Sequence, residues 1–110
     1  MMKYGLKQHC IHSIVEVFRK YPQVDSALLY GSRAKGVFRY NSDIDLTLKG
    51  KLDLTTLLKI ENDLDDLLLP YKIDLSSYEK INSKELIDHI HQEGVVFYEK
   101  NIEKVAGKEA

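Results

Sequence analysis

Apolar residues recur at helical spacing in three parts of the chain. In the first part they are Leu6, Cys10, Ile11, Ile14, Val15 and Phe18, which predicts an amphipathic helix over about residues 7–20. Tyr21-Pro22 ends this helix, because the residue before a proline is pushed out of the helical region. A second helix is predicted over about residues 54–69 and stops at Pro70. A third begins after the cap residue Ser83 and is interrupted by Gly94.

Segments typical of strands lie between these helices. Residues 24–30 predict a short strand, and its last four residues, ALLY, are apolar enough to be buried on both faces. Residues 43–48, DIDLTL, alternate with the period of a strand, and so do residues 71–75. Between the first two strands, Arg33 to Val37 predict one helical turn with Ser32 as its N-cap.

The order helix, strand, turn, strand, helix, strand, helix indicates an α+β domain of two layers. We expect a small mixed β-sheet with helices packed on one side, formed by residues 1–98. Residues 99–110 form a charged tail that we expect to be frayed. The apolar run at residues 95–98 suits either the core or a partner interface, and the pattern favours neither.

The composition of the chain argues against several classes of protein. The chain has 110 residues, the usual size of one domain, and a net charge of −1, without the basic excess of proteins that bind duplex nucleic acid. Its one cysteine, Cys10, cannot form an intrachain disulfide, which indicates a reducing compartment. The N-terminus lacks the apolar core of a signal peptide, and no apolar run is long enough to cross a bilayer. We therefore expect a cytoplasmic protein without direct binding to nucleic acid or membrane.

Three aspartates share the phase of the predicted strands. Asp43 and Asp45 are two residues apart and thus project from one face, while Ile44 enters the core behind them. Asp74 has the same phase on its own strand, so the three carboxylates cluster if the two strands are neighbours. Such a cluster is unfavourable unless protons or cations neutralise it. Mg²⁺ suits it best, and two ions can clamp the attacking and leaving oxygens of a phosphoryl or nucleotidyl transfer.

A candidate phosphate site precedes the carboxylates. Gly31-Ser32 follows a buried strand, and glycine lets a phosphate approach the backbone closely. Free N–H groups of the turn and the Ser32 hydroxyl can then bind that phosphate. Arg33, Lys35 and Arg39 add positive charge near the same point. Together these residues predict a site for a metal-bound nucleoside triphosphate.

Each motif alone has a simpler explanation. An Asp-x-Asp pair on an alternating strand is usually a solvated face, and Ser after Gly is usually a turn. At average residue frequencies, however, Gly-Ser, ten residues and Asp-x-Asp coincide by chance on the order of once in a thousand chains of this length. The strand context and Asp74 lower those odds further. The combination favours a catalytic site.

The spacing of Gly31-Ser32 and Asp43-Ile44-Asp45 resembles the signature of the DNA polymerase β-like nucleotidyltransferases. The string GSRAKG…R..SDIDL is similar to the minimal nucleotidyltransferases, called MNT or MntA proteins. The resemblance implies an ATP-dependent enzyme whose metal ligands are Asp43, Asp45 and Asp74, with Asp74 also helping to activate the attacking hydroxyl. It further implies that Gly31 and Ser32 bind the triphosphate, and we add Arg33 to this nucleotide-binding set.

The resemblance also implies a partner. Minimal nucleotidyltransferases commonly act as antitoxins that transfer AMP from ATP to a tyrosine of a HEPN-domain toxin ribonuclease. The sequence agrees with this, because no second domain that could bind an acceptor follows the predicted catalytic core. Two alternatives stay open. One is transfer to a small molecule such as an aminoglycoside or a nucleotide, although that class usually has an extra helical domain. The other is an antitoxin that acts by binding alone.

Overall fold

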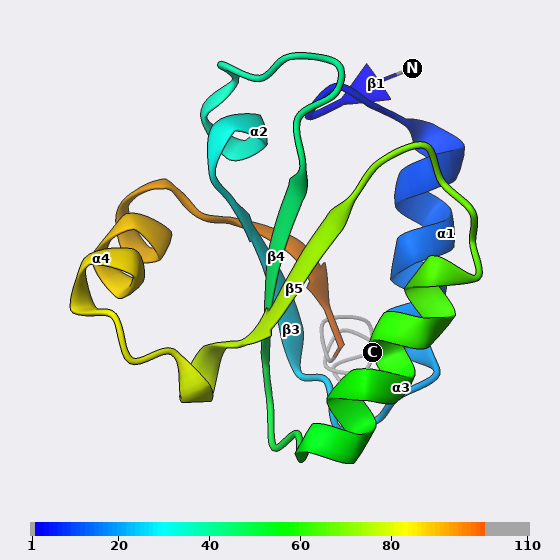
Figure 1. Cartoon of the computed structure of the whole chain (residues 1–110), viewed down its shortest axis with the longest axis vertical. Helices are drawn as coiled ribbons and strands as arrows, with labels where there is room; N and C mark the ends of the chain where they lie inside the picture. Colours follow the sequence, from blue (N-terminus) through cyan, green and yellow to red (C-terminus); the bar gives the residue numbers. More distant parts are fainter. Residues whose placement is uncertain (1, 101–110) are drawn as a thin grey trace, which may run out of the picture.

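A four-stranded mixed sheet forms the centre of the computed structural model, which describes residues 2–100. Its strands are β3 (Ser26–Tyr30), β4 (Ile44–Lys49), β5 (Ile73–Ser77) and β6 (Val95–Glu99), in the order β5-β4-β3-β6 (Figure 1). The β4 and β5 strands are parallel, and the other neighbours are antiparallel. Two strands of two residues, β1 (Met2–Lys3) and β2 (Leu6–Lys7), make a separate hairpin that the sequence pattern did not predict.

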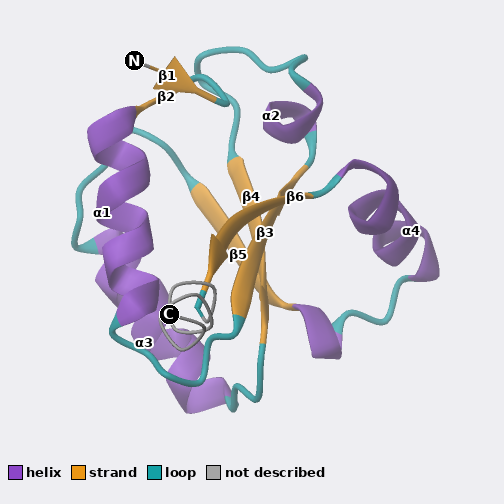
Figure 2. Cartoon of the chain, turned by 180° about the vertical axis from the view of Figure 1, so that it is seen from behind, coloured by secondary structure: helices purple, strands orange, loops and turns teal. Residues whose placement is uncertain are grey.

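Helices cover both faces of this sheet. The helices are α1 (Gln8–Arg19), α2 (Ser32–Lys35), α3 (Leu54–Asp65) and α4 (Lys84–Glu93), with a 3₁₀ turn at Tyr78–Lys80. Figures 1 and 2 show α1 and α3 together on one side of the strands and α4 on the other. The predicted α+β class and mixed sheet are confirmed. The expected placement of helices on one side holds for α1 and α3, whereas α4 packs on the opposite face.

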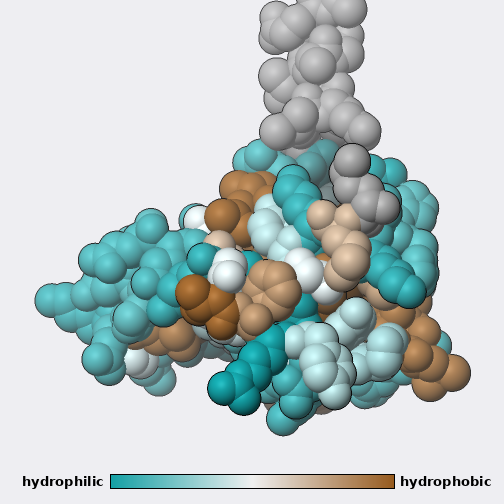
Figure 3. Space-filling view, turned by 90° about the horizontal axis from the view of Figure 1, so that it is seen from above, coloured by the Kyte–Doolittle hydropathy of each residue, from teal (hydrophilic) through white to brown (hydrophobic). Residues whose placement is uncertain are grey.

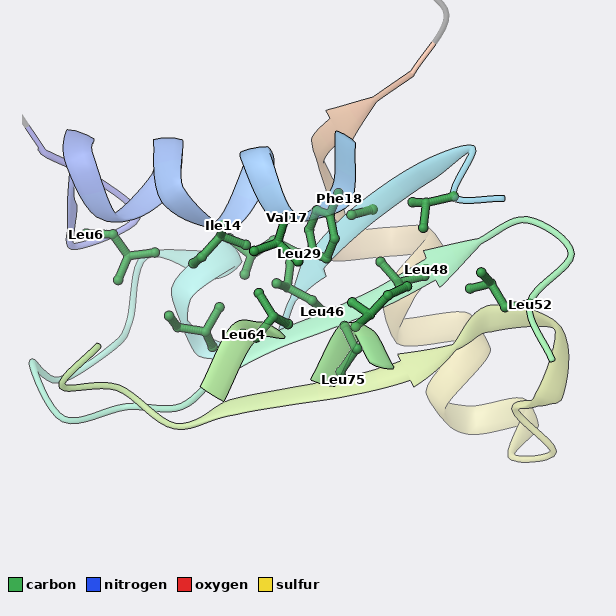
Figure 4. Close-up of a cluster of buried hydrophobic side chains, with 14 residues drawn as sticks. Leu6, Ile14, Val17, Phe18, Leu29, Leu46, Leu48, Leu52, Leu64 and Leu75 are labelled. Carbon is green, nitrogen blue, oxygen red and sulfur yellow. The ribbon is translucent and has the colours of Figure 1, made fainter. Parts of the chain in front are cut away.

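The main core lies between the sheet and the pair α1 and α3 (Figure 4). On β4, the side chains of Ile44, Leu46 and Leu48 are completely buried there. Burying an aliphatic side chain of this size stabilises the fold by about 1.5–3 kcal/mol. Because side chains alternate along a strand, the same burial directs Asp45 and Thr47 to the opposite face. Burial of these aliphatic side chains thus determines which face of the sheet carries the Asp45 carboxylate.

Side-chain caps set where two of the helices begin. The Asp53 carboxylate accepts a hydrogen bond of 2.8 Å from the Thr56 N–H at the start of α3. The Ser83 hydroxyl accepts one of 3.1 Å from the Leu86 N–H at the start of α4, which confirms the predicted cap. Gly94 then separates α4 from β6.

The final described residues belong to the sheet. The β6 strand pairs with β3 and extends through Glu99, one residue into the predicted tail. The Lys100 N–H donates to the Asp25 carbonyl (3.0 Å), and its ammonium lies 3.3 Å from the Asp25 carboxylate. Residues 101–110, the rest of the predicted tail, lie outside the described residues. Within the described range, every helix is too short or too polar to cross a bilayer.

Candidate active site

Asp45 and Asp74 are direct neighbours on the sheet. Each is the second residue of its strand, and the parallel register of β4 and β5 pairs them. Because register partners on neighbouring strands point to the same face of a sheet, the two carboxylates share one face. Neighbouring strands lie about 4.8 Å apart, so the two residues are also close together. The two acidic strands are thus neighbours, which is the condition that the sequence set for the carboxylates to lie together. Asp43 is exposed and lies in the segment just before β4, two residues from Asp45.

The three carboxylates interact electrostatically. Burial raises the pKa of Asp45 above its ordinary value, and the negative charges of Asp74 and Asp43 raise it further. The ion pairs among the described residues include none with Asp43, Asp45 or Asp74. No basic side chain of the described residues thus lies within ion-pair distance of these carboxylates, and a bound cation would relieve their mutual repulsion.

The donor set suits a hard cation. All three side chains offer carboxylate oxygens, the ligands that Mg²⁺ takes. In the part of the chain that the structure describes, no three histidine, cysteine, aspartate or glutamate side chains are grouped closely enough to hold an ion between them. Mg²⁺ does not need such a cage, because it usually binds one or two protein carboxylates and takes its other ligands from water and substrate phosphates. The chemistry of the residues fits the ion.

Gly31 brings the backbone against Asp45. It follows β3 directly and has φ +80° and ψ −157°, a region that essentially only glycine occupies. A Cβ atom built on Gly31 would collide with the Asp45 carboxylate oxygen Oδ2. The turn and the carboxylate are thus packed together, as the proposed combination of a phosphate site and a metal site requires.

Ser32 is the first residue of α2, and Gly31, not Ser32, is the N-cap residue. The predicted role of Ser32 as a cap is wrong, because the positive φ of Gly31 already turns the chain into the helix. Ser32 is half-buried, and no described residue hydrogen-bonds its hydroxyl. The hydroxyl can therefore bond to a ligand.

The structure corrects the prediction for Arg33. Its side chain is 1 % exposed, and its guanidinium donates to the backbone carbonyls of Tyr4, Tyr40 and Ser42. In this position it does not face a triphosphate. Lys35 and Arg39 remain at the surface, where Lys35 lies 3.6 Å from Glu93.

Tyr30 also belongs to this face of the sheet, although the sequence indicated only a buried strand residue. It is the register partner of Asp45 on β3, so Tyr30, Asp45 and Asp74 form a row across three strands. Burial raises the pKa of Tyr30, the Ser76 hydroxyl partly offsets this, and the charges of Asp45 and Asp74 add to it. Its position directly before Gly31, in phase with Asp45, is the signal that could have identified it.

Comparisons with known proteins show the family and the fold of the chain. The family model described as "Polymerase beta, Nucleotidyltransferase" matches residues 12–103. A chain of a toxin–antitoxin complex solved with AMP-PNP is 22% identical, with a TM-score of 0.67, and the match covers 82% of this chain and 73% of that one. A chain from the complex of tri-AMPylated Shewanella oneidensis HEPN toxin with MNT antitoxin is 19% identical (TM-score 0.63; 90% and 77% covered).

A chain of an MntA–HepT toxin–antitoxin complex is similar in the same way, with 20% identity and a TM-score of 0.63 over 86% of this chain and 74% of that one. At these identities the likeness shows the fold. No curated protein matches the sequence.

Proposed function

Because the chain belongs to the polymerase β nucleotidyltransferase family, we propose that it transfers AMP from ATP to a tyrosine of a HEPN-domain toxin and so neutralises it. The observation that carries the proposal is the pairing of Asp45 with Asp74 directly beside the Gly31 turn. That arrangement brings two carboxylates that have no ion-pair partner among the described residues next to the glycine turn that leads into α2.

The residues have separate roles in the proposed reaction. Asp43 and Asp45 would hold Mg²⁺, with Asp74 as the third carboxylate, and Mg²⁺ when bound neutralises charge on the triphosphate. Backbone N–H groups after Gly31, together with the Ser32 hydroxyl, would hold the triphosphate, since the first N–H groups of a helix have no partner within it. The acceptor oxygen attacks the α-phosphorus, and the bond to the β-phosphate oxygen breaks. Pyrophosphate leaves, and Asp74 takes the hydroxyl proton.

The surface beside the site supports a protein acceptor. The segment between α2 and Asp43 exposes Val37 (70 %) and Tyr40 (87 %). Figure 3 shows apolar side chains exposed among polar ones at the end of the molecule that carries α2 and the β1–β2 hairpin. Exposed apolar and aromatic side chains are typical of protein interfaces. The neighbours in toxin–antitoxin complexes, one with AMP-PNP and one with a tri-AMPylated HEPN toxin, point to the same class of acceptor.

The test is a transfer assay with ATP labelled at the α-phosphate, Mg²⁺ and a purified HEPN-domain protein as the acceptor. We expect label on a partner tyrosine, identified by mass spectrometry, and loss of that label in Asp43→Ala and Asp45→Ala. Asp66→Ala is the matched control, because it removes an exposed carboxylate away from the site and should transfer normally. Excess chelator should abolish transfer.

Two results would contradict the proposal. Neutralisation of the toxin by both aspartate variants, without any label, would indicate an antitoxin that acts by binding. Label on an aminoglycoside or a nucleotide, with none on the HEPN protein, would indicate a small-molecule acceptor.

Ser32→Ala should weaken the binding of ATP without unfolding the domain. A hydrogen bond to a charged group contributes about 1.5–3 kcal/mol, so we expect affinity to fall roughly tenfold to a hundredfold. Calorimetric titration with ATP measures the affinity, and a thermal melt checks the fold. An unchanged affinity would remove Ser32 from the phosphate site.

A further inference from the structure

A single guanidinium joins three segments near the carboxylates. Arg33 Nη1 donates to the Tyr4 carbonyl (2.9 Å), and Nη2 donates to the carbonyls of Tyr40 (3.2 Å) and Ser42 (2.9 Å). Nε donates to the same Ser42 carbonyl at 3.2 Å. Arg33 is the largest fully buried side chain among the described residues, and no carboxylate pairs with it.

Aromatic rings and a glycine enclose the same group. The guanidinium carbon lies 5.2 Å from the ring centre of Phe38 and 5.0 Å from that of Tyr71, within the range of a cation–π contact. A Cβ atom on Gly5 would come within 2.9 Å of Nη1 and would collide with the Phe38 ring. The hairpin turn therefore closes over the guanidinium, and little freedom remains for its plane.

These contacts connect the parts of the site. Arg33 follows Ser32 in α2, Ser42 precedes Asp43, and Tyr71 lies three residues before Asp74. The Ser42 carbonyl receives two bonds from Arg33, and the Ser42 hydroxyl accepts a further bond of 2.8 Å from the Arg39 N–H. The backbone immediately before Asp43 is thus held from α2, the element that carries Ser32.

We propose that Arg33 is a positioning residue for nucleotidyl transfer: it fixes Asp43 relative to Ser32 through the Ser42 carbonyl and does not touch the nucleotide. This inference rests on the proposed function of the same site. A charge that is buried without a counter-ion is costly, and carbonyl oxygens and ring faces compensate only part of that cost. What arginine provides in return is a rigid planar set of donors spread over several nitrogen atoms, whereas the donors of lysine all lie on one nitrogen atom.

The arrangement also leaves the carboxylate oxygens of the three aspartates without an ion pair to Arg33. A guanidinium that reached the carboxylates would pair with them and compete with a divalent cation for the same oxygens. Because Arg33 donates to backbone carbonyls, it makes no ion pair with Asp43 or Asp45 and does not occupy their carboxylate oxygens.

The experiment compares Arg33→Lys with a control substitution in the core, Val17→Ala. Val17 is buried in α1, which covers the face of the sheet opposite to the Asp45 carboxylate. Both substitutions should lower the thermal midpoint, since both alter buried side chains. The direct readout is the affinity for Mn²⁺ in the absence of nucleotide, measured by electron paramagnetic resonance. We expect Arg33→Lys to weaken Mn²⁺ binding at least tenfold and Val17→Ala to leave it unchanged.

Kinetics separate positioning from contact with the nucleotide. For Arg33→Lys we expect the Mg²⁺ concentration at half-maximal rate to rise and kcat to fall, each at least tenfold, with the KM for ATP changed less than threefold. A raised KM for ATP with unchanged kcat would mean that Arg33 binds nucleotide, and unchanged Mn²⁺ binding would mean a merely structural role. Either result overturns the inference.

A second variant keeps the inference testable if Arg33→Lys does not fold. Phe38→Leu keeps an apolar side chain but removes one ring face from the guanidinium. We therefore expect Mn²⁺ binding to weaken about threefold, the Mg²⁺ requirement to rise about threefold and kcat to fall about threefold. Unchanged Mn²⁺ binding in this variant would again count against the inference. The Mn²⁺ measurement also distinguishes two failures. If the unmodified protein binds Mn²⁺ but labels no acceptor, the proposed function is wrong, and the positioning role is still decided by the metal affinities.

Discussion

Replacing Gly31 with alanine is expected to abolish nucleotidyl transfer. At φ +80° and ψ −157° an alanine is strained by about 1–3 kcal/mol, and its Cβ atom would overlap the Asp45 carboxylate. Either the turn or Asp45 must then move, which separates the proposed phosphate-binding backbone from the proposed metal ligand. Because a misplacement of about 1 Å can cost a hundredfold in rate, we expect at least that loss in the AMP-transfer assay.

Gly36→Ala is the matched control for this substitution. Gly36 also has a positive φ, +82°, but a Cβ atom there would meet nothing within 4 Å. We expect it to lower the thermal midpoint modestly and to keep most of the activity. If Gly31→Ala and Gly36→Ala lose the same small fraction of activity, the close packing of Gly31 on Asp45 has no catalytic importance.

Replacing Asp45 with asparagine should have opposite effects on activity and stability. Transfer should fall more than about 100-fold, beyond the 10- to 100-fold typical of lost outer-shell partners of a metal, because Asp45 is a proposed ligand. The thermal midpoint at neutral pH should rise by a few degrees. The reason is that burial and the charges of Asp74 and Asp43 raise the pKa of Asp45, so its ionised form destabilises the folded state.

The pH dependence tests the cause of this stabilisation. A carboxyl group whose pKa is raised on folding destabilises the protein fully above its folded pKa. The penalty declines as the pH falls through that value and is gone below the unfolded pKa, because Asp45 is then neutral in both states. The difference in midpoint between Asp45→Asn and the unmodified protein should therefore shrink on acidification. A difference that is constant with pH, or an Asp45→Asn protein less stable at neutral pH, would contradict the assigned electrostatics.

The carboxylate geometry followed from the sequence because strand alternation is a strong local signal. In β4, three aliphatic residues at every second position leave Asp45 no other face, and Asp74 alternates with Ile73 and Leu75 in the same way. The signature spacing of Gly31 and Asp45 also had a direct structural cause, the close contact between them. Alternation within a strand and a fixed spacing between motifs can both be recognised in the sequence without knowledge of which segments meet.

The features that the sequence did not reveal depend on which atoms or which sheet face an element contacts, and no periodicity or spacing specifies these. Nothing local in Arg33 shows that its acceptors are the carbonyls of Tyr4, Tyr40 and Ser42, so its place beside the candidate phosphate site predicts a nucleotide ligand instead. Strands of two residues, as in the β1–β2 hairpin, are too short to show a period. The apolar stripe of α4 predicts a helix but does not say which face of the sheet it covers.

The central proposal is that Asp43 and Asp45, with Asp74 beside them, bind a divalent cation together with a triphosphate held beside Gly31. Its most direct test is calorimetric titration of a non-hydrolysable ATP analogue, with Mg²⁺ present, into the unmodified protein and into the double variant Asp43→Asn, Asp45→Asn. We predict binding to the unmodified protein that is at least tenfold weaker in the double variant and equally weak in excess chelator. Equal affinities in all three titrations would contradict the claim.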